Sequence, residues 1–414
     1  MNPPPAELDL AFVPCRRFGR TELQMPLLSL GGMRFQQSWS DLPAEEITVE
    51  SQVNLESILK AAIGAGMHHI ETARFYGSSE LQLGKLLATH PDPKRILQTK
   101  IAPYANSKEF ESMLERSFEL LQVQRLDLLT LHGINLPEHL EQCLRPGGCL
   151  EIVKRWQSDG CIGHVGFSTH GPLALIEAAI NSGSFDYVNI HWYYIRQDNS
   201  PALSAAIDQD MGVFIISPTD KGGHLHSPSE RLKQLCEPLH PIVFNDLFCL
   251  SDPRVHTISV GAATAADLDL HLQAVGLLPK AEELLPLISA RLQAALQQKL
   301  GDAWLNSWQQ GLPPWQDTPG QINLPILLWL HNLLEGWDLQ SYAKARYGLL
   351  GQANHWFPGC NADFFEAPAG SEGAVSEAEL LAALAESPWR AEIPAILRHL
   401  KQALGGSVLQ RLGS

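Results

Sequence analysis

Hydrophobic residues between positions 25 and 263 follow two alternating patterns. The first consists of eight short runs rich in aliphatic and β-branched residues, several of them almost continuously apolar. Such runs are typical of strands that are buried on both faces of a parallel sheet. We predict strands at 25–32, 68–73, 95–101, 126–133, 164–169, 187–192, 212–217 and 257–263.

The second pattern has the spacing of helices and lies between these runs. Serine precedes two of the helical segments and glycine follows four segments, as helix caps commonly do. The segments are 54–66, 79–90, 107–123, 148–160, 171–183 and 200–210, and the expected caps are Ser79, Ser107, Gly66, Gly160, Gly183 and Gly212. Repeated alternation of strand and helix predicts an α/β fold, a closed (β/α)8 TIM barrel. A doubly wound sheet is the alternative, but no GxGxxG glycines follow the first strand, which favours the barrel.

The length and the change of pattern near residue 278 predict a second unit. A chain of 414 residues exceeds the roughly 250 residues of a typical barrel. Beyond this point helical periodicity, interrupted by Pro, Gly and Trp, replaces the strand and helix alternation. We therefore expect an N-terminal tail at 1–16, the barrel at 17–278 and an all-helical extension at 279–414.

Composition excludes several classes of protein. A formal net charge of −15 and a pI near 5.5 argue against nucleic acid as a partner, because phosphate binding needs clustered Lys and Arg. No signal peptide is evident, and the longest apolar stretch, 322–334, is too short to span a bilayer. Seven cysteines without a CxxC pair predict free thiols and no zinc site. We expect a soluble, cytoplasmic protein without a membrane partner.

Polar residues gather where the predicted strands end, at the barrel mouth that carries the chemistry of this fold. Each one taken alone has a structural explanation: Lys100 fits a solvated strand end, His132 a hydrogen-bonded core position and Tyr76 a packed loop. Together they favour a functional site. The set comprises Glu71, Lys100, His132, Ser168, Thr169, Asn189 and Ser217.

Residues 66–87, GMHHIETARFYGSSELQLGKLL, resemble the aldo-keto reductase signature, with Glu71 and Tyr76 at two of its catalytic positions. QTK ending at Lys100 and LLTLHG around His132 resemble the third and fourth positions. The resemblance extends from about residue 17 to about residue 275. It implies an oxidoreductase that reduces a small aldehyde or ketone with a nicotinamide nucleotide.

The resemblance also implies a role for each catalytic residue. Tyr76 is expected to act as the general acid, with Lys100 lowering its pKa, Glu71 holding the ammonium and His132 orienting the substrate oxygen. The usual aspartate of the family is glutamate here. The added methylene can displace the carboxylate by about an ångström, a shift that can cost about a hundredfold in rate.

The expected cofactor is NADP(H) or NAD(H). Resemblance to the family assigns Ser168, Thr169 and Asn189 to the nicotinamide side, and Gly32 and Met33 to the ring and its ribose. The turn from Ser217 to Gly223, with Lys221 and Gly222, is expected along the pyrophosphate. The adenosine-phosphate segment begins at Gly261 and, to residue 272, contains no basic side chain, so we expect weak discrimination between the two nucleotides.

The extension resembles that of a subgroup of aldo-keto reductases with ferredoxin-type four-iron clusters, in YGLLGQANHWFPG at 347–359 and PWRAEIPAILRHL at 388–400. Four thiolates hold such a cluster, and Cys360 alone remains in this region. We therefore expect no iron-sulfur cluster and no metal, and a packing role or a protein partner for the extension. Three interpretations stay open: a reductase, a barrel that binds a nucleotide or protein without turnover, and a helical interaction module.

Overall fold

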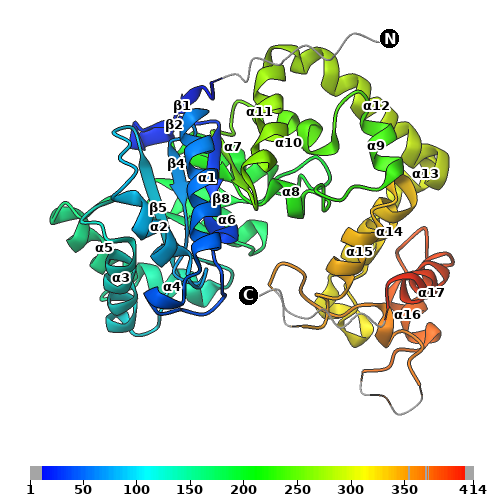
Figure 1. Cartoon of the computed structure of the whole chain (residues 1–414). Coiled ribbons are helices and arrows are strands. Elements are labelled where there is room, and N and C mark those ends of the chain that lie inside the picture. The colour runs from blue at the N-terminus through cyan, green and yellow to red at the C-terminus, as the bar shows by residue number, and fades with distance from the viewer. Residues whose placement is uncertain (1–11, 353–354, 369–370, 372, 406–414) are drawn as a thin grey trace, which may run out of the picture. The chain divides into compact units, whose positions relative to one another are not determined.

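The computed structural model describes residues 12–352, 355–368, 371 and 373–405 (Figure 1). The chain divides into two compact units. The first, the barrel unit, comprises Met1–Gly222 and Ile242–Glu282, and the second, the C-terminal unit, comprises Gly223–Pro241 and Glu283–Ser414. The polypeptide therefore passes from one unit to the other more than once.

Eight parallel strands close into a barrel, which confirms the predicted (β/α)8 fold. Each predicted run overlaps one strand of the barrel. In spatial order the strands are β3 (Leu28–Gly31), β4 (His69–Glu71), β5 (Ile96–Ile101), β6 (Leu126–Leu131), β7 (Ile162–Ser168), β8 (Tyr187–Ile190), β9 (Gly212–Ile215) and β10 (Thr257–Gly261), which pairs again with β3.

Helices follow the strands and cover the outside of the barrel (Figure 1). They are α1 (Val49–Gly64), α2 (Ser79–Leu87), α3 (Ser107–Leu121), α4 (Pro137–Leu144), α5 (Cys149–Ser158), α6 (Leu173–Asn181), α7 (Ser200–Asp208), α8 (Pro218–Lys221), α10 (Pro241–Ser251) and α11 (Leu268–Leu277). Short 3-10 turns include η1 (Gly19–Thr21) and η2 (Gly32–Arg34).

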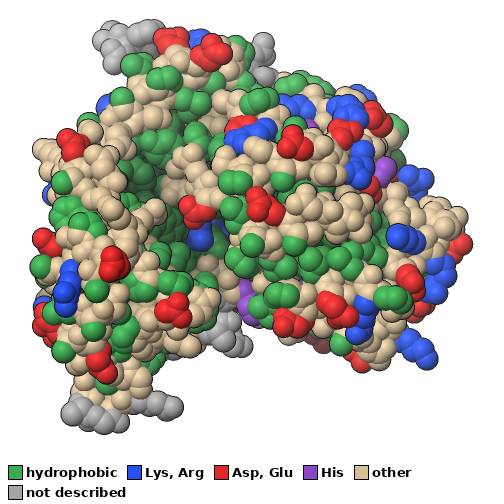
Figure 2. Space-filling view, turned by 180° about the vertical axis from the view of Figure 1, so that it is seen from behind, with side chains coloured by type: hydrophobic (Ala, Val, Ile, Leu, Met, Phe, Trp, Pro, Cys, Tyr) green, Lys and Arg blue, Asp and Glu red, His purple; other side chains and the backbone are tan. Residues whose placement is uncertain are grey.

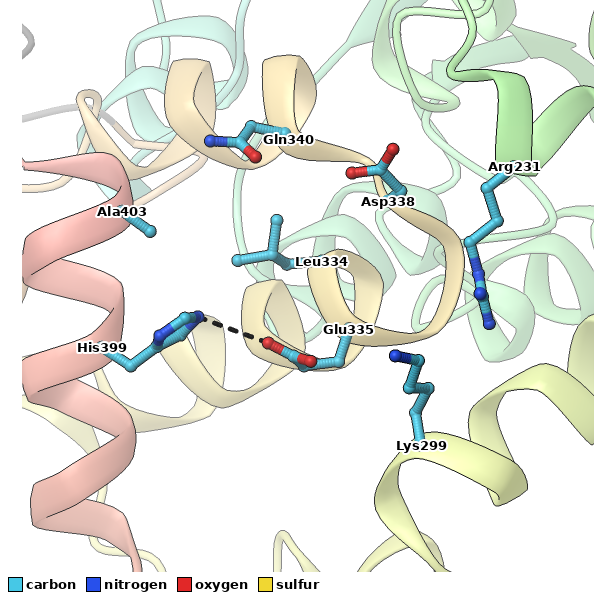
Figure 3. Close-up of a pocket in the computed structure, with 8 residues that line it drawn as sticks. All are labelled: Arg231, Lys299, Leu334, Glu335, Asp338, Gln340, His399 and Ala403. Atoms are coloured by element: carbon cyan, nitrogen blue, oxygen red, sulfur yellow. Dashed lines mark ion pairs between the residues drawn. The ribbon is translucent and has the colours of Figure 1, made fainter.

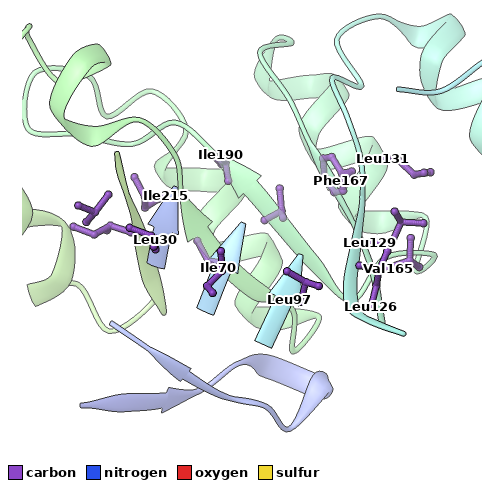
Figure 4. Packing of buried hydrophobic residues seen from close by; sticks show 14 of the residues in the cluster. Leu30, Ile70, Leu97, Leu126, Leu129, Leu131, Val165, Phe167, Ile190 and Ile215 are labelled. Atoms are coloured by element: carbon purple, nitrogen blue, oxygen red, sulfur yellow. The ribbon is translucent and has the colours of Figure 1, made fainter. Parts of the chain in front are cut away.

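Aliphatic side chains on the outer face of the strands form the main core with these helices (Figure 4). Leu30, Ile70 and Leu97, from β3, β4 and β5, are in register on adjacent strands and are almost fully buried. Since successive residues of a strand point to opposite faces, the residues directly before and after Leu30, Ile70 and Leu97 in their strands face the barrel axis.

The barrel interior is polar at mid-height. Ser29 Oγ lies 2.6 Å from His69 Nδ1 and 2.7 Å from Thr257 Oγ1. Thr130 Oγ1 accepts a hydrogen bond from Gln98 Nε2 at 2.6 Å. Burial lowers the pKa of His69 to about 3, so this imidazole is uncharged.

An antiparallel hairpin of β1 (Cys15–Arg17) and β2 (Gln24–Pro26) precedes the barrel and was not predicted. Phe18, in its turn, packs in a buried cluster with Ile96, Tyr187 and Phe214, which lie at or near the start of their strands. Phe18 therefore closes the amino end of the barrel and leaves the carboxyl end for chemistry.

The C-terminal unit is helical. α14 contacts both α15 and α17, so these helices form its centre. Its helices are α9 (Glu230–Cys236), α12 (Ala281–Leu300), α13 (Asp302–Ser307), α14 (Leu324–Trp337), α15 (Gln340–Tyr347), α16 (Glu377–Ala383) and α17 (Ile393–Leu404). Helix α9 is a separate insertion, since it lies between β9 and β10 in the sequence.

The expected helix caps are only partly correct. Gly66, Gly160 and Gly183 have the positive φ of a left-handed cap, at 89°, 77° and 67°. Gly212 instead begins β9, where the ring of Phe18 occupies the space of a Cβ. The expected serine N-caps are off by one residue, because α3 is capped by Asn106, whose side chain accepts from the Lys108 amide, and α2 begins after Ser78.

Basic and acidic side chains are interspersed on the face drawn in Figure 2. Among the described residues, no helix combines the length and apolar character needed to cross a bilayer.

Candidate active site and cofactor site

The candidate catalytic residues lie at the carboxyl ends of three adjacent strands. Glu71 ends β4, Lys100 lies next to last in β5 and His132 directly follows β6. Glu71 and Lys100 are each two residues beyond an inward-facing residue, His69 and Gln98, so the strand period of two places them inside the barrel.

Lys100 and Glu71 form a buried ion pair. Lys100 Nζ also donates to the backbone carbonyl of Thr72 at 2.9 Å, and Ser259 Oγ donates to Glu71 Oε1 at 3.0 Å. Burial lowers the pKa of Lys100 to about 7. The ion pair brings the carboxylate of Glu71 against this amine, and the expected role of Glu71 in holding it stays a prediction.

Tyr76 lies in the loop between β4 and α2, beside this pair. Lys100 Nζ is 5.0 Å from the centre of the Tyr76 ring, over its face. Burial raises the pKa of Tyr76 to about 12. The expected lowering of this pKa by Lys100 stays a prediction, and the Lys100 ammonium donates to Glu71 and to the Thr72 carbonyl.

His132 meets the edge of Tyr76. Their ring centres are 5.9 Å apart at an interplanar angle of 87°. Burial, together with the charges of Lys100 and Lys221, lowers the pKa of His132 to about 3. Its buried Nδ1 has no hydrogen-bond partner within the described structure. A neutral imidazole with an unused nitrogen is suited to hydrogen bonding with a substrate oxygen.

The expected nicotinamide side lies across the mouth on β7 and β8. Ser168 and Asn189 are paired in register on these strands. Both side-chain amide atoms of Asn189 are buried without a partner among the described residues. Because buried amides normally form hydrogen bonds, this pair of orphaned atoms fits a ligand that offers one donor and one acceptor, such as a primary carboxamide.

The neighbouring hydroxyls are engaged within the loops. Ser168 Oγ accepts from the Gly133 amide at 3.0 Å and retains a proton to donate. Thr169 Oγ1 donates to the Ile134 carbonyl at 2.7 Å and accepts from the Gly171 amide at 2.8 Å. Ser168 therefore has the capacity for a ligand, whereas Thr169 is already used in holding the loop.

A tight turn follows β9, which we call the 217–222 turn. Ser217 has a positive φ of 53°, and its carbonyl accepts from the Lys221 amide at 3.0 Å. A Cβ on Gly222 would lie 2.1 Å from the Pro218 carbonyl, so only glycine fits there. Asn245, from α10, donates to the same carbonyl at 3.2 Å. The turn thus presents Lys221 from a fixed backbone.

The remaining expected residues lie on the β3 side of the mouth. A Cβ on Gly32 would be 2.5 Å from the Glu71 carbonyl, which brings this backbone close to the catalytic pair. Met33 is 41% exposed. Gly261, at the end of β10, is in register with Gly31. The residues expected to be catalytic and those expected to contact the cofactor therefore lie on one ring of strand ends.

Residues 27–273, more than half of the sequence, match the model of the Aldo/keto reductase family. The chain belongs to the aldo/keto reductase family. A curated relative, D-arabinose 1-dehydrogenase of Saccharomyces cerevisiae, is 28% identical over 154 residues, which are 34% of this chain and 42% of that protein. This member of the family thus spans less than half the length of the relative it matches.

Solved aldo-keto reductases share the fold. The structure of AKR11C1 from Bacillus halodurans in its holo form covers 67% of this chain and 96% of its own, with 18% identity and a TM-score of 0.56. An aldo-keto reductase from Klebsiella pneumoniae, solved in complex with NADPH, covers 67% and 95%, with 18% identity and a TM-score of 0.51. At this identity the similarity establishes the barrel architecture.

Two features of this aldo/keto reductase site escaped the sequence analysis. The first is Ser259, which contacts Glu71. Ser259 comes two residues after the polar Thr257 on β10, and this spacing was the signal in the sequence that both side chains face the barrel axis. The exposed side chain of Arg34, from η2, lies 3.8 Å from the place of a Cβ on Gly261. A basic side chain from another part of the sequence therefore lies next to the start of segment 261–272, which itself contains no Lys or Arg.

Figure 3 shows a separate hollow of about 380 Å³ within the C-terminal unit. Arg231 and Lys299 face it together with Glu335, which pairs with His399 at 3.3 Å. Arg231 Nε donates to the Gly336 carbonyl at 2.8 Å. Its lining contains no phenol and no thiol, so it resembles neither the catalytic mouth nor a cluster site.

Cys360 lies in the C-terminal unit at a short bridge to Ile322. Burial raises the pKa of its thiol, which disfavours the thiolate that binds metal. No group of three potential metal ligands occurs among the described residues.

Proposed function

We propose that the protein is an oxidoreductase that reduces an aldehyde or ketone with a nicotinamide nucleotide, and that Tyr76 is the proton donor. The observation that carries the proposal is the convergence of Tyr76, Lys100 and His132 at the carboxyl end of the barrel. Family membership supports the reaction type.

The residues present fit the nucleotide. The orphaned amide of Asn189 and the free proton of Ser168 would hold the carboxamide, and Lys221 on the 217–222 turn would meet the pyrophosphate. When bound, the nucleotide supplies the hydride. The nucleotide bound by the Klebsiella pneumoniae protein supports NADP(H) as the first one to test.

Proton transfer is assigned to the opposite side of the mouth. As the carbonyl carbon accepts the hydride, its oxygen gains the π electrons and takes the proton of the Tyr76 hydroxyl. His132 donates a hydrogen bond to that oxygen and orients it. The positive charge of Lys100, 5.0 Å from the ring centre, stabilises the resulting phenolate until solvent returns the proton. A pKa of about 12 keeps Tyr76 protonated before each turnover.

Tyr76→Phe is the direct test. Removing the hydroxyl should lower the rate of carbonyl reduction by about 100-fold or more, because general acid catalysis commonly contributes a factor of this size. Nucleotide binding, followed by fluorescence quenching, should be retained. Tyr187→Phe, which removes a buried hydroxyl near the amino end of the barrel, is the matched control. Unchanged turnover in Tyr76→Phe would refute the assignment.

The substrate panel should include sugars as well as small aldehydes and ketones. The curated relative is named for oxidation of a pentose at its first carbon, which supports testing D-arabinose and other pentoses in the reverse direction. Turnover by the wild-type chain of either substrate type would support the oxidoreductase.

A barrel that binds a nucleotide or a protein partner without turnover is the second candidate. Two observations favour it: Lys100 is engaged by Glu71, and burial raises the pKa of Tyr76. Both make proton release from the phenol less favourable. Nucleotide binding without turnover on the full panel would support this candidate, with the helical extension as the partner-binding part.

A further inference from the structure

Two histidines and a tyrosine form a hydrogen-bonded chain beside the cofactor side of the mouth. His191 Nδ1 lies 2.6 Å from the Tyr193 hydroxyl, and His191 Nε2 lies 2.6 Å from His170 Nδ1. The two imidazole planes are inclined by 24°, with centres 4.6 Å apart, which suits an N–H···N bond near the ring planes. His191 and Tyr193 are almost completely buried.

The hydrogen-bonding capacity of each group fixes the direction of the chain. The Tyr193 hydroxyl donates its one proton to the Ile216 carbonyl. His191 must then donate from Nδ1 to the Tyr193 oxygen, which leaves Nε2 as the acceptor. His170 therefore donates from Nδ1 to that nitrogen, and both imidazoles are satisfied without a charge.

This chain reaches the start of the 217–222 turn. Ile216, held by Tyr193, directly precedes Ser217 at the start of the turn. Lys221 Nζ lies 3.5 Å from His170 Nδ1, but this nitrogen carries the proton donated to His191 and therefore does not accept a hydrogen bond from the ammonium. The three members also follow strands with proposed cofactor contacts, since His170 comes two residues after Ser168 and His191 two residues after Asn189.

We propose that His191 and Tyr193 are positioning residues for the 217–222 turn. They act through Ile216, whose carbonyl accepts from the Tyr193 hydroxyl, so that the start of the turn keeps one conformation relative to β7 and β8. The part of the proposal that concerns the nucleotide rests on the proposed function. An apolar core at these positions would not need two buried polar groups, His191 and Tyr193, whose burial is favourable only when both are satisfied.

Tyr193→Phe removes the hydroxyl that holds Ile216 and keeps the ring. In the free protein we expect amide hydrogen exchange of a peptide covering 212–223 to become about fivefold faster, because a buried hydrogen bond typically contributes about 1 kcal/mol. NADPH should bind about five- to tenfold more weakly, while kcat with saturating nucleotide changes less than twofold.

A pair of variants at His191 gives the second comparison. Glutamine carries a donor and an acceptor and can bridge Tyr193 and His170, whereas leucine can do neither. His191→Gln should therefore stay closer to the wild type than His191→Leu in both exchange and NADPH affinity. If Tyr193→Phe does not fold, the comparison of the two His191 variants tests the proposal in its place.

Tyr187→Phe is the control for loss of a buried tyrosine hydroxyl elsewhere in the barrel, and it should leave exchange of 212–223 unchanged. Unchanged exchange of this peptide in Tyr193→Phe, or equal effects of the two His191 variants, would overturn the proposal. If the wild type binds no nicotinamide nucleotide, the proposed function fails, and the exchange measurements alone decide the positioning role.

Discussion

The ammonium of Lys100 is paired with the carboxylate of Glu71 inside the barrel, and the same ammonium lies over the ring of Tyr76. Glu71 therefore determines where the positive charge sits relative to the phenol. The other carboxylate oxygen of Glu71 accepts a hydrogen bond from Ser259.

Neutralising this carboxylate should destabilise the fold. Glu71→Gln leaves Lys100 buried without a counter-charge, and removing one partner of a buried pair costs about 3 kcal/mol or more. We expect the free energy of unfolding, measured by urea denaturation, to fall by about this amount. Glu71→Asp keeps the charge and should lose clearly less. Equal stability of Glu71→Gln and the wild type would mean that Lys100 is already neutral in the native state.

The pKa of Lys100 predicts the pH dependence of turnover. Because burial lowers this pKa to about 7, the ammonium is present below pH 7 and is lost as the pH rises through that value. Tyr76, with a pKa of about 12, stays protonated over the same range. We therefore expect kcat/KM for carbonyl reduction to decline above about pH 7.

Lys100→Arg provides the check on this assignment. Arginine keeps its charge at these pH values, so the decline should move to higher pH in whatever activity remains. A profile that is identical in the arginine variant would assign the decline to another group.

Asn189 should show opposite effects on stability and binding. Asn189→Leu replaces two buried, unpartnered polar atoms with hydrocarbon of similar size, which we expect to raise the free energy of unfolding by about 1 kcal/mol. The same change removes the proposed carboxamide contacts and should weaken NADPH binding by about tenfold. Calorimetric unfolding and fluorescence titration measure the two effects. A variant that binds NADPH as tightly as the wild type would remove Asn189 from the cofactor site.

Arg34 is the candidate contact for the 2′-phosphate of NADPH. Its side chain stands beside Gly261, and no ion pair holds it within the described structure. Arg34→Gln should weaken NADPH binding by about tenfold or more, the size of a hydrogen bond to a charged group, and leave NADH binding unchanged. Equal effects on both nucleotides would indicate a role in the common part of the cofactor. Lys85→Gln, a change at a half-buried lysine on α2 that donates to the Ala44 carbonyl, serves as the control.

The C-terminal unit should contain no iron-sulfur cluster. Cys360 is the one cysteine in the region that resembles the cluster-binding extension, and burial raises the pKa of its thiol. We expect iron well below one atom per chain after anaerobic purification, with no change in Cys360→Ser. About four iron atoms per chain by colorimetric assay would contradict this.

The sequence predicted the barrel because each strand run is short, apolar and followed by a helical segment. It also predicted which residues meet at the mouth, since Glu71, Lys100 and Asn189 keep the period of two that turns them inward. The hairpin at the amino end was not predicted, because β1 precedes the first apolar run and β2 overlaps the start of that run, which was assigned to one strand.

Other parts of the site depend on contacts that local patterns do not encode. The raised pKa of Tyr76 follows from its burial in the folded chain, which a spacing argument cannot give. The chain through His170 and His191 joins three separate strand ends, and each histidine alone looks like an ordinary core residue. The place of Arg34 beside Gly261 results from the pairing of β3 with β10, the first and last strands of the barrel.

Residues 223–241 belong to the C-terminal unit although they lie between two barrel strands in the sequence, and this affects where the chain can be truncated. The hydroxyl of Ser229 donates to the Trp337 carbonyl, and Leu232 and Cys236 of α9 are buried. A stop codon near position 278 would delete the helices that cover this insertion while leaving it attached to both β9 and β10. A shortened product would thus expose an apolar loop next to Lys221, and expression of an isolated barrel would require replacing 223–241 with a short polar linker.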